Sequence, residues 1–271
     1  MSNQTRQNPT KINRLLSDWP KGTVATYAWL HQHGVTRQLA SHYRRSQWLE
    51  TIGRGAFIRR GDKVDWAGGL YALQRAPDCT IHVAGKSALE LLGYSHFLSL
   101  GNRQPVWLLG APRDRLPAWF AGQAWSRPVR YLGTRLFDAK ASSVGLSNHD
   151  AGGFTIRISG AERAMLETLL FAPKSQSLEE ARLLMEGLAT LRPTLVQELL
   201  THCTAIKVKR LFLLLADLCD HRWLAEIDQS KLDLGRGKRA LVPGGRFHPK
   251  YQLTVPAEFV PETGPSDEPQ A

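Results

Sequence analysis

Cysteine is scarce in this chain of 271 residues, and long apolar runs are missing from it. The three cysteines, Cys79, Cys203 and Cys219, are widely spaced and form no Cys-x-x-Cys pair, which excludes a disulfide framework and leaves a zinc site without support. The most apolar run, Leu211 to Leu215, is far shorter than the roughly 20 residues of a membrane span. The polar first ten residues contain no apolar segment of a secretory signal. We therefore expect a cytoplasmic protein with no membrane partner, metal or cofactor.

Acidic side chains are also few, and they are fewest near the start of the chain. The sequence has 35 Lys and Arg against 24 Asp and Glu, a net charge of +11. Residues 1–75 have 12 basic and 4 acidic side chains, a net of +8, whereas residues 76–271 have 23 and 20. A short segment with such an excess typically meets phosphate, although a solubilising surface is the alternative.

The order of elements in residues 1–75 is that of a winged helix-turn-helix domain. Apolar spacing and capping residues predict three helices and a two-stranded hairpin around Gly53-Arg54-Gly55. The expected elements are helices at Lys11–Trp19, from the Thr23 cap to His33 and from the Thr36 cap to Ser46, strands at Trp48–Ile52 and Ala56–Arg60, and a closing helix at Trp66–Gln74.

Residues 76–260 are predicted to form a larger mixed α/β domain with a helical C-terminal half, so the fold class is α+β. The expected strands are Thr80–Ala84, Val106–Leu109, Val129–Leu132 and Phe154–Ile158, and the expected helices are Lys86–Leu92, Ala161–Phe171, Leu178–Leu191, Thr194–His202 and Ile206–His221. A final hairpin is expected to pair Leu241–Val242 with Tyr251–Val255 around Pro243-Gly244-Gly245. The acidic, Pro-rich residues 261–271 are expected to be a disordered tail.

The helix after Thr36 has one face without any acidic residue. At about 100° per residue, five polar or basic side chains fall within an arc of about 120°, and Leu39 and Tyr43 lie opposite them as core anchors. Arginine and glutamine can bond the edges of guanine and adenine, and an arginine-bearing wing commonly reaches phosphate. The predicted DNA-binding residues are Thr36, Arg37, Gln38, Ser41, Arg44, Arg45, Arg54, Arg59 and Arg60.

A second basic stretch lies around the last hairpin. Six positive side chains fall within twenty residues, and only Asp233 opposes them; they are Lys231, Arg236, Lys238, Arg239, Arg246 and Lys250. The set from Arg236 to Lys250 is a candidate surface for an acidic partner or nucleic acid, with Gly235 and Gly237 giving the backbone freedom to reach it. A solvated hairpin accounts for the same charge equally well.

Two motifs resemble catalytic or nucleotide-binding sites but are incomplete. Ala84-Gly85-Lys86-Ser87 matches half of a P-loop, and Thr80 stands where the first glycine should be. Asp138-Ala139-Lys140 could end a restriction-type nuclease site, but the earlier acidic ligand is missing from a suitable strand. We therefore expect no catalytic residues and no enzyme activity.

Three blocks of the sequence resemble the AbiEi antitoxins of bacterial type IV toxin–antitoxin systems. The first runs from Leu15 to Arg60 and includes Gly34-Val35-Thr36-Arg37-Gln38-Leu39. The second is Gly85-Lys86-Ser87-Ala88-Leu89-Glu90-Leu91-Leu92-Gly93. The third comprises Val208-Lys209-Arg210-Leu211-Phe212, Leu232-Asp233-Leu234-Gly235-Arg236-Gly237-Lys238-Arg239 and Lys250-Tyr251-Gln252-Leu253-Thr254-Val255-Pro256. The order of the three blocks is more specific than the winged helix alone.

The resemblance implies an antitoxin that represses its own operon by binding inverted repeats of double-stranded DNA in the promoter. It also implies a cognate nucleotidyltransferase-like toxin, which the larger domain counteracts with or without direct contact. Two alternatives remain open from the residues. One is a winged-helix transcription factor that responds to a ligand, and the other is a nuclease that a winged helix directs to DNA.

Overall fold

The computed structural model describes residues 10–94 and 104–260, and its mixture of helices and sheets confirms the α+β class. The chain divides into two compact units. Unit 1 comprises Met1–Val83, Gly101–Thr134 and Ser147–Ile158, and unit 2 comprises Ala84–Leu100, Arg135–Leu146 and Ser159–Ala271. The predicted tail at 261–271 lies outside the described residues. The predicted boundary at residue 75 falls within unit 1, and independent folding of residues 1–75 stays a prediction.

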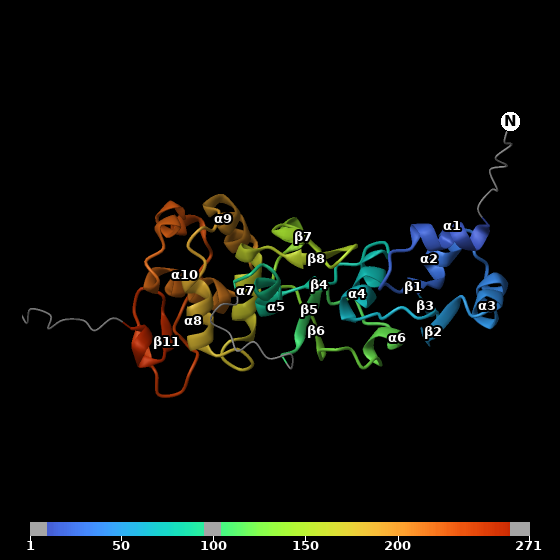
Figure 1. Cartoon of the computed structure of the whole chain (residues 1–271). Coiled ribbons are helices and arrows are strands. Elements are labelled where there is room, and N and C mark those ends of the chain that lie inside the picture. Colours follow the sequence, from blue (N-terminus) through green and yellow to red (C-terminus); the bar gives the residue numbers. More distant parts are fainter. Residues whose placement is uncertain (1–9, 95–103, 261–271) are drawn as a thin grey trace, which may run out of the picture. The chain divides into compact units, whose positions relative to one another are not determined.

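The first part of unit 1 is a winged helix, drawn in blue in Figure 1. Its helices are α1 (Lys11–Asp18), α2 (Tyr27–Gln32) and α3 (Arg37–Arg45), and its strands are β1 (Ala25–Thr26), β2 (Leu49–Gly53) and β3 (Ala56–Arg59). The strands form one antiparallel sheet in the order β1-β3-β2. Apolar side chains from all three helices and the sheet share one buried core, in which Leu15, Trp19, Leu30, Leu49 and Phe57 are at most 3% exposed.

The start of α2 differs from the sequence prediction. Thr26, and not Thr23, caps this helix, and its hydroxyl accepts a hydrogen bond from the backbone N–H of Trp29 at 3.3 Å. Thr23 is fully buried instead, where its hydroxyl accepts from Trp19 Nε1 at 3.0 Å and donates to the carbonyl oxygen of Pro20 at 2.7 Å. Ala25 and Thr26 itself form β1, which is held by pairing with β3. A nonlocal strand contact therefore displaces the helix start.

A mixed five-stranded sheet completes unit 1, together with α4 (Trp66–Gln74) and α6 (Ala118–Ala121). In the order β6-β5-β4-β8-β7 its strands are Val129–Gly133, Val106–Gly110, His82–Val83, Thr155–Ser159 and Leu146–Asp150. Strand β5 runs parallel to β6 and antiparallel to β4, and β4 runs parallel to β8. Sequence patterning predicted four of these strands and α4, but it missed β7 and α6.

The wing packs closely on the segment that contains α6. A Cβ atom built on Gly53 would lie 2.6 Å from the Cβ of Trp119, so only glycine fits at this end of β2. Gln123 donates a hydrogen bond from its side-chain amide to the carbonyl oxygen of Ile52. Asp65 accepts from the backbone N–H of Ser126 at 3.0 Å. The winged helix and the segment between β5 and β6 therefore share direct contacts within unit 1.

Unit 2 is mainly helical and ends in a small sheet. Its helices are α5 (Gly85–Leu91), α7 (Ala161–Phe171), α8 (Leu178–Glu186), α9 (Pro193–His202) and α10 (Ile206–Leu218), and short 3-10 turns lie at Ala139–Ala141, Arg222–Glu226, Gln229–Lys231 and Ala257–Phe259. As the sequence predicted, α10 is buried nearly all round, and every residue from Leu211 to Ala216 is fully buried. Among the described residues, no helix has the length and apolar character needed to cross a membrane.

A buried carboxylate explains the P-loop-like motif in unit 2. Glu167 on α7 is 1% exposed and accepts hydrogen bonds from the backbone N–H of Gly85 at 3.1 Å, from the Ser159 hydroxyl at 2.6 Å and from Arg163 Nε at 2.8 Å. Lys86, the motif's lysine, forms an ion pair with Glu180. The start of α5 therefore binds an internal anion, as the dipole and free N–H groups of a helix start favour.

The last sheet is not the predicted hairpin around Pro243-Gly244-Gly245. Its strands are β9 (Arg239–Ala240), β10 (Arg246–His248) and β11 (Leu253–Val255), in the order β10-β11-β9. Strand β11 pairs antiparallel with β10 and parallel with β9. The turn at Pro249 to Gln252 joins the antiparallel pair, and Gln252 adopts a positive φ of 53° there. The hairpin therefore lies later in the sequence than predicted.

Candidate nucleic-acid interface

Helix α3 is fixed at its start by a local cap and a tight turn. The Thr36 hydroxyl accepts a hydrogen bond from the backbone N–H of Leu39 at 3.2 Å, which satisfies one of the free donors of the first helical turn. Gly34 lies between α2 and α3 with a φ of +72°, a conformation that glycine adopts without strain. The adjoining Val35 is 1% exposed and anchors the turn in the core. This arrangement presents α3 as the second helix of a helix-turn-helix.

The outer face of α3 carries the residues that the sequence predicted for DNA. Arg37, Gln38, Arg44 and Arg45 are exposed, and Ser41 is half-buried. On the inner face Ala40 is fully buried and Tyr43 is 7% exposed, and burial raises the pKa of the Tyr43 hydroxyl. Leu39, predicted as a core anchor, is only partly buried against this core. The geometry brings four exposed hydrogen-bond donors to one face, and their role in DNA binding stays a prediction.

The wing adds further cations near the end of α3. Arg54 is exposed at the tip between β2 and β3, and Arg60 is exposed directly after β3. The Arg60 guanidinium donates a hydrogen bond to the side-chain oxygen of Gln47. A hollow of about 470 Å³ lies between these elements and is lined by Arg44, Gln47, Leu49, Glu50, Thr51 and Arg60. Helix and wing thus place Arg44 and Arg60 on one hollow, together with the carboxylate of Glu50.

Arg59 points elsewhere. Its Nη2 group donates to the carbonyl oxygen of Leu16 on α1 at 2.6 Å, and its guanidinium carbon lies 5.7 Å from the centre of the Trp19 ring. Burial lowers the pKa of Arg59. These contacts join β3 to α1 inside the winged helix. The structure therefore separates Arg59 from Arg54 and Arg60, with which the sequence analysis grouped it.

Trp48 is a surface residue that the sequence analysis did not single out. It is 47% exposed, the largest value among the big apolar side chains that the structure describes. Its backbone bonds the end of α3 to the wing, since its N–H donates to the carbonyl oxygen of Tyr43 at 2.9 Å and its carbonyl accepts from Arg60 at 3.1 Å. An aromatic residue at this junction, beside exposed arginines, is suited to contacts with sugar or base. The sequence signal that could have indicated it is a tryptophan at the start of a predicted strand.

The second basic stretch lies in unit 2 and divides into paired and unpaired cations. Lys250 Nζ lies 2.8 Å from Asp217 Oδ2, and Lys231 Nζ lies 2.9 Å from Asp228 Oδ2. Each of these pairs raises the pKa of its lysine. Lys238 Nζ lies 4.7 Å from the centre of the Phe247 ring. The exposed cations of this stretch that form no ion pair with a described residue are Arg236, Lys238, Arg239 and Arg246, which we call the sheet-edge cations.

The loop before β9 is held in place, although its sequence suggested a flexible lead-in. Arg210 on α10 is 3% exposed, and its guanidinium donates to the carbonyl oxygens of Leu234 at 2.7 Å, Gly235 at 3.1 Å and Gly237 at 2.7 Å. Both glycines have positive φ, 64° and 78°. The two glycines are therefore required by the bends of this loop, and Arg236 projects from a fixed backbone.

The nuclease alternative requires further acidic side chains close to Asp138 and Lys140, and the structure gives Asp138 other partners. Asp138 caps the turn at Ala139–Ala141 and lies 2.9 Å from His202 Nδ1. The hydrogen bond from His202 is the largest cause that lowers the pKa of Asp138. Within residues 10–94 and 104–260, no group of three or more His, Cys, Asp or Glu side chains could bind a metal ion. Burial raises the pKa of Cys203 and of Cys219 to about 11, which keeps both thiols protonated at neutral pH.

Two family models cover the two parts of the chain. The model described as "Transcriptional regulator, AbiEi antitoxin N-terminal domain" matches residues 8–100, and the model described as "Transcriptional regulator, AbiEi antitoxin, Type IV TA system" matches residues 103–256. The chain belongs to the AbiEi antitoxin family. The resemblance seen in the sequence is thereby confirmed, and the chain is a transcriptional regulator of the antitoxin class of type IV toxin–antitoxin systems.

A solved structure shares the fold. The crystal structure of the RV2827C protein from Mycobacterium tuberculosis has a TM-score of 0.53 and 20% sequence identity, and the match covers 92% of each chain. At this identity the similarity shows the architecture alone. No curated protein matches the chain. Catalysis has no positive support, since a family of regulatory antitoxins is generally non-enzymatic.

Proposed function

We propose that α3 and the wing bind double-stranded DNA and that the chain represses its own operon through inverted repeats in the promoter. The observation that carries the proposal is the exposed face of α3, where Arg37, Gln38, Arg44 and Arg45 stand on a capped helix. No acidic residue occurs between Asp18 and Glu50, so this surface has no internal counterion from that part of the chain. A helix of this kind fits the major groove, and the wing reaches the adjacent backbone.

Fluorescence anisotropy with labelled duplexes from the chain's own promoter tests the proposal. The double variant Arg44→Ala/Arg45→Ala should weaken binding at least tenfold. It should also reduce the slope of log K against log salt concentration by about 0.9 for each phosphate that the variant no longer neutralises. Arg130→Ala/Arg222→Ala is the matched control, because it removes the same charge from exposed positions on other elements. Equal affinity in the two double variants would reject the proposal.

We also propose that the antitoxin acts on a nucleotidyltransferase-like toxin and that the sheet-edge cations contribute to this activity. These four side chains lack acidic partners in the described part of the chain, whereas Lys231 and Lys250 have them. An acidic protein surface or nucleic acid would complement such a cluster. Direct contact with the toxin is one route to neutralisation, and competition for a shared nucleic acid is another.

Growth rescue tests this second proposal in cells that express the neighbouring toxin gene. Lys238→Ala/Arg239→Ala in the full chain should lose rescue, and Arg130→Ala/Arg222→Ala should retain it at equal protein levels. Arg44→Ala/Arg45→Ala should retain rescue as well, because repression and neutralisation use different surfaces. Loss of rescue only in the α3 variant would place neutralisation in the winged helix and contradict the assignment to unit 2.

A further inference from the structure

Unit 1 contains a cavity between the winged helix and the neighbouring sheet segment. Its volume is about 580 Å³, within the roughly 300–1,000 Å³ of small-molecule sites. Helix α2 forms one side, residues 72–81 form another, and residues 113–119 form the third. Most of the wall is apolar, and it includes Ala28, Trp29, Leu73, Ile81, Pro117 and Trp119. Such a wall with a few polar groups at its margin is typical of a ligand site.

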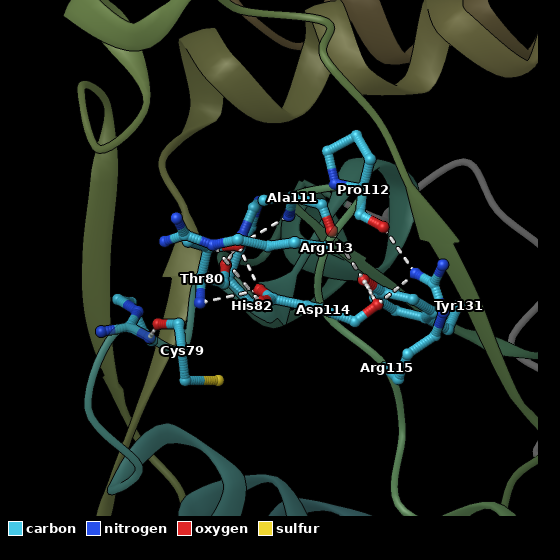
Figure 2. Close-up of polar contacts among 10 residues, drawn as sticks. Cys79, Thr80, His82, Ala111, Pro112, Arg113, Asp114, Arg115 and Tyr131 are labelled. Carbon is cyan, nitrogen blue, oxygen red and sulfur yellow. Dashed lines mark hydrogen bonds and ion pairs between the residues drawn. The ribbon is translucent and has the colours of Figure 1, made fainter.

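A polar network holds the third side of the cavity in one conformation. Figure 2 shows Asp114 at the centre of this network, where its Oδ2 atom accepts from the backbone N–H of Thr80 at 3.1 Å and from the Thr80 hydroxyl at 2.5 Å. The Thr80 hydroxyl in turn accepts from the backbone N–H of Ala111 at 2.6 Å. The Tyr131 hydroxyl donates to the carbonyl oxygens of Ala111 and Asp114, each at 3.2 Å. The wall is therefore preformed, which lowers the entropic cost of binding.

The charged groups that line the cavity favour an anion. Arg75, Arg113 and Arg115 line the cavity together with two carboxylates, Asp78 and Asp114, and the Arg75 guanidinium carbon lies 5.2 Å from the centre of the Tyr71 ring. The Asp114 carboxylate is already occupied by Thr80, and its Oδ1 atom lies 4.0 Å from Arg113 Nε, a distance too long for a strong ion pair. The Arg113 side chain is 70% exposed, so its guanidinium is accessible to a ligand. The lining therefore has three positive side chains against two carboxylates; Thr80 engages one carboxylate, and Arg115 donates to the carbonyl oxygens of Pro112 and Asp114, which leaves Arg75 and Arg113 for a ligand.

We propose that this cavity binds a small organic anion with a flat apolar body. Trp29 and Trp119 supply flat surfaces for the body, and Arg75 and Arg113 supply donors for the charged group. The site uses other residues than the DNA contacts proposed above, since none of its lining residues lies on α3 or on strands β2 and β3 of the wing. A ligand in this cavity would contact α2, the helix that precedes α3 in the helix-turn-helix.

Binding of 8-anilinonaphthalene-1-sulfonate to the full chain, measured by fluorescence without DNA, tests the proposal. We expect saturable binding at one site in the micromolar range. Ala28→Trp fills the cavity from helix α2 and should weaken binding at least tenfold, and Ala76→Trp should do the same from the facing loop. Ala189→Trp, at an exposed position in unit 2, is the matched control and should leave binding unchanged.

The charge preference is tested with a neutral probe. Arg75→Ala/Arg113→Ala should weaken binding of the sulfonate at least fivefold and leave binding of uncharged N-phenyl-1-naphthylamine unchanged, whereas Arg130→Ala/Arg222→Ala should affect neither. Circular dichroism checks that each variant is folded, and the two tryptophan variants on separate elements guard against misfolding of one. Absence of saturable binding, or equal binding by the wild type and both cavity-filling variants, would overturn the proposal.

Discussion

Glu162 and Arg192, which are thirty residues apart in the sequence, form a bidentate ion pair in unit 2. Arg192 Nε lies 2.8 Å from Glu162 Oε1, and Arg192 Nη2 lies 3.2 Å from Oε2. The backbone N–H of Arg192 also donates to Oε1 at 3.2 Å. The Glu162 side chain is 5% exposed and that of Arg192 is 68% exposed. The pair thus fixes the residue before α9 to the first turn of α7.

This pair predicts a pH dependence of stability. Burial raises the pKa of Glu162, but the hydrogen bonds and charge of Arg192 outweigh burial and lower the pKa below its usual value. A depressed pKa in the folded state stabilises the protein above the unfolded-state pKa of about 4.3, and this stabilisation is lost as the pH falls through the folded-state pKa. Glu162→Gln should therefore lower the unfolding free energy by about 2 kcal/mol at pH 7 and by less as the pH falls below 4. Urea unfolding followed by circular dichroism measures this, and a difference that does not change with pH would contradict it.

Removal of the cap on α3 should destabilise the winged helix. Thr36→Ala leaves the N–H of Leu39 without its side-chain acceptor, at a cost of about 1 kcal/mol. Thr36→Ser retains the hydroxyl and should melt within about a degree of the wild type. If Thr36 also contacts DNA, as the sequence predicts, Thr36→Ala should weaken binding in the anisotropy assay more than Thr36→Ser does. Identical melting of both variants would show that the cap is unimportant.

Arg210 should be among the most sensitive positions of unit 2. Arg210→Met keeps most of the side-chain volume but leaves the carbonyl oxygens of Leu234, Gly235 and Gly237 without their donor, and we expect a decrease in stability of about 3 kcal/mol. Arg210→Lys should recover only part of this, because an ammonium group cannot reproduce the planar arrangement of donors. Arg182→Met, at a more exposed salt bridge, is the control and should cost less than about 1 kcal/mol. Thermal melts of the three variants give the comparison.

The contact between Gly53 and Trp119 predicts an effect of a single methyl group. In Gly53→Ala the new Cβ would meet the Trp119 backbone at 2.9 Å and its Cβ at 2.6 Å, which should cost about 1–3 kcal/mol. Gly187→Ala is the control, because its new Cβ has 3.5 Å to the nearest atom and the glycine has no positive φ. Thermal melts measure both variants, and equal stability of the two would show that the wing does not depend on this contact.

The predicted boundary near residue 75 leads to a further test. A fragment of residues 1–75 retains the winged-helix core, but it lacks Trp119, Gln123 and Ser126, which contact the wing and Asp65 in the full chain. We expect a helical circular dichroism spectrum, a lower melting temperature than the full chain and weaker DNA binding. A folded fragment with no affinity for DNA at low salt would contradict the assignment of DNA binding to this segment.

Local signals predicted the elements whose ends are set within a few residues. The Thr36 cap located α3, and apolar spacing located α4 and α7 with the bounds that the structure shows. The start of α2 could not be predicted in the same way, because Thr23 and Thr26 are both suitable caps. The choice between them depends on the pairing of Thr26 with Ala56, thirty residues later. The parallel pairing of β9 with β11 is nonlocal for the same reason.

In the candidate site, too, the sequence predicted the features set by local periodicity and missed those set by nonlocal contacts. The exposed face of α3 follows from helical periodicity, and the structure has Arg37, Gln38, Arg44 and Arg45 on it. Strand periodicity could have separated Arg59 from the wing cations, since it is two residues from the buried Phe57 and so shares its face of β3. The cavity beside α2 had no sequence signal, because its walls come from three distant segments.

The tripeptide Gly-Arg-Gly occurs twice, at residues 53–55 and 235–237, and the two copies satisfy different constraints. In the first, Gly53 is required by a neighbouring side chain and Gly55 by a φ of +79°, and the arginine is exposed at the tip of a hairpin. In the second, the guanidinium of Arg210 donates hydrogen bonds to the backbone carbonyls of the loop. The protein therefore binds its own loop through main-chain groups, in the way that a receptor binds a peptide ligand. Alanine substitutions in the two tripeptides should therefore have unrelated effects. Exchange of the two loops would transfer neither the exposed hairpin tip of the first nor the Arg210-bound backbone of the second.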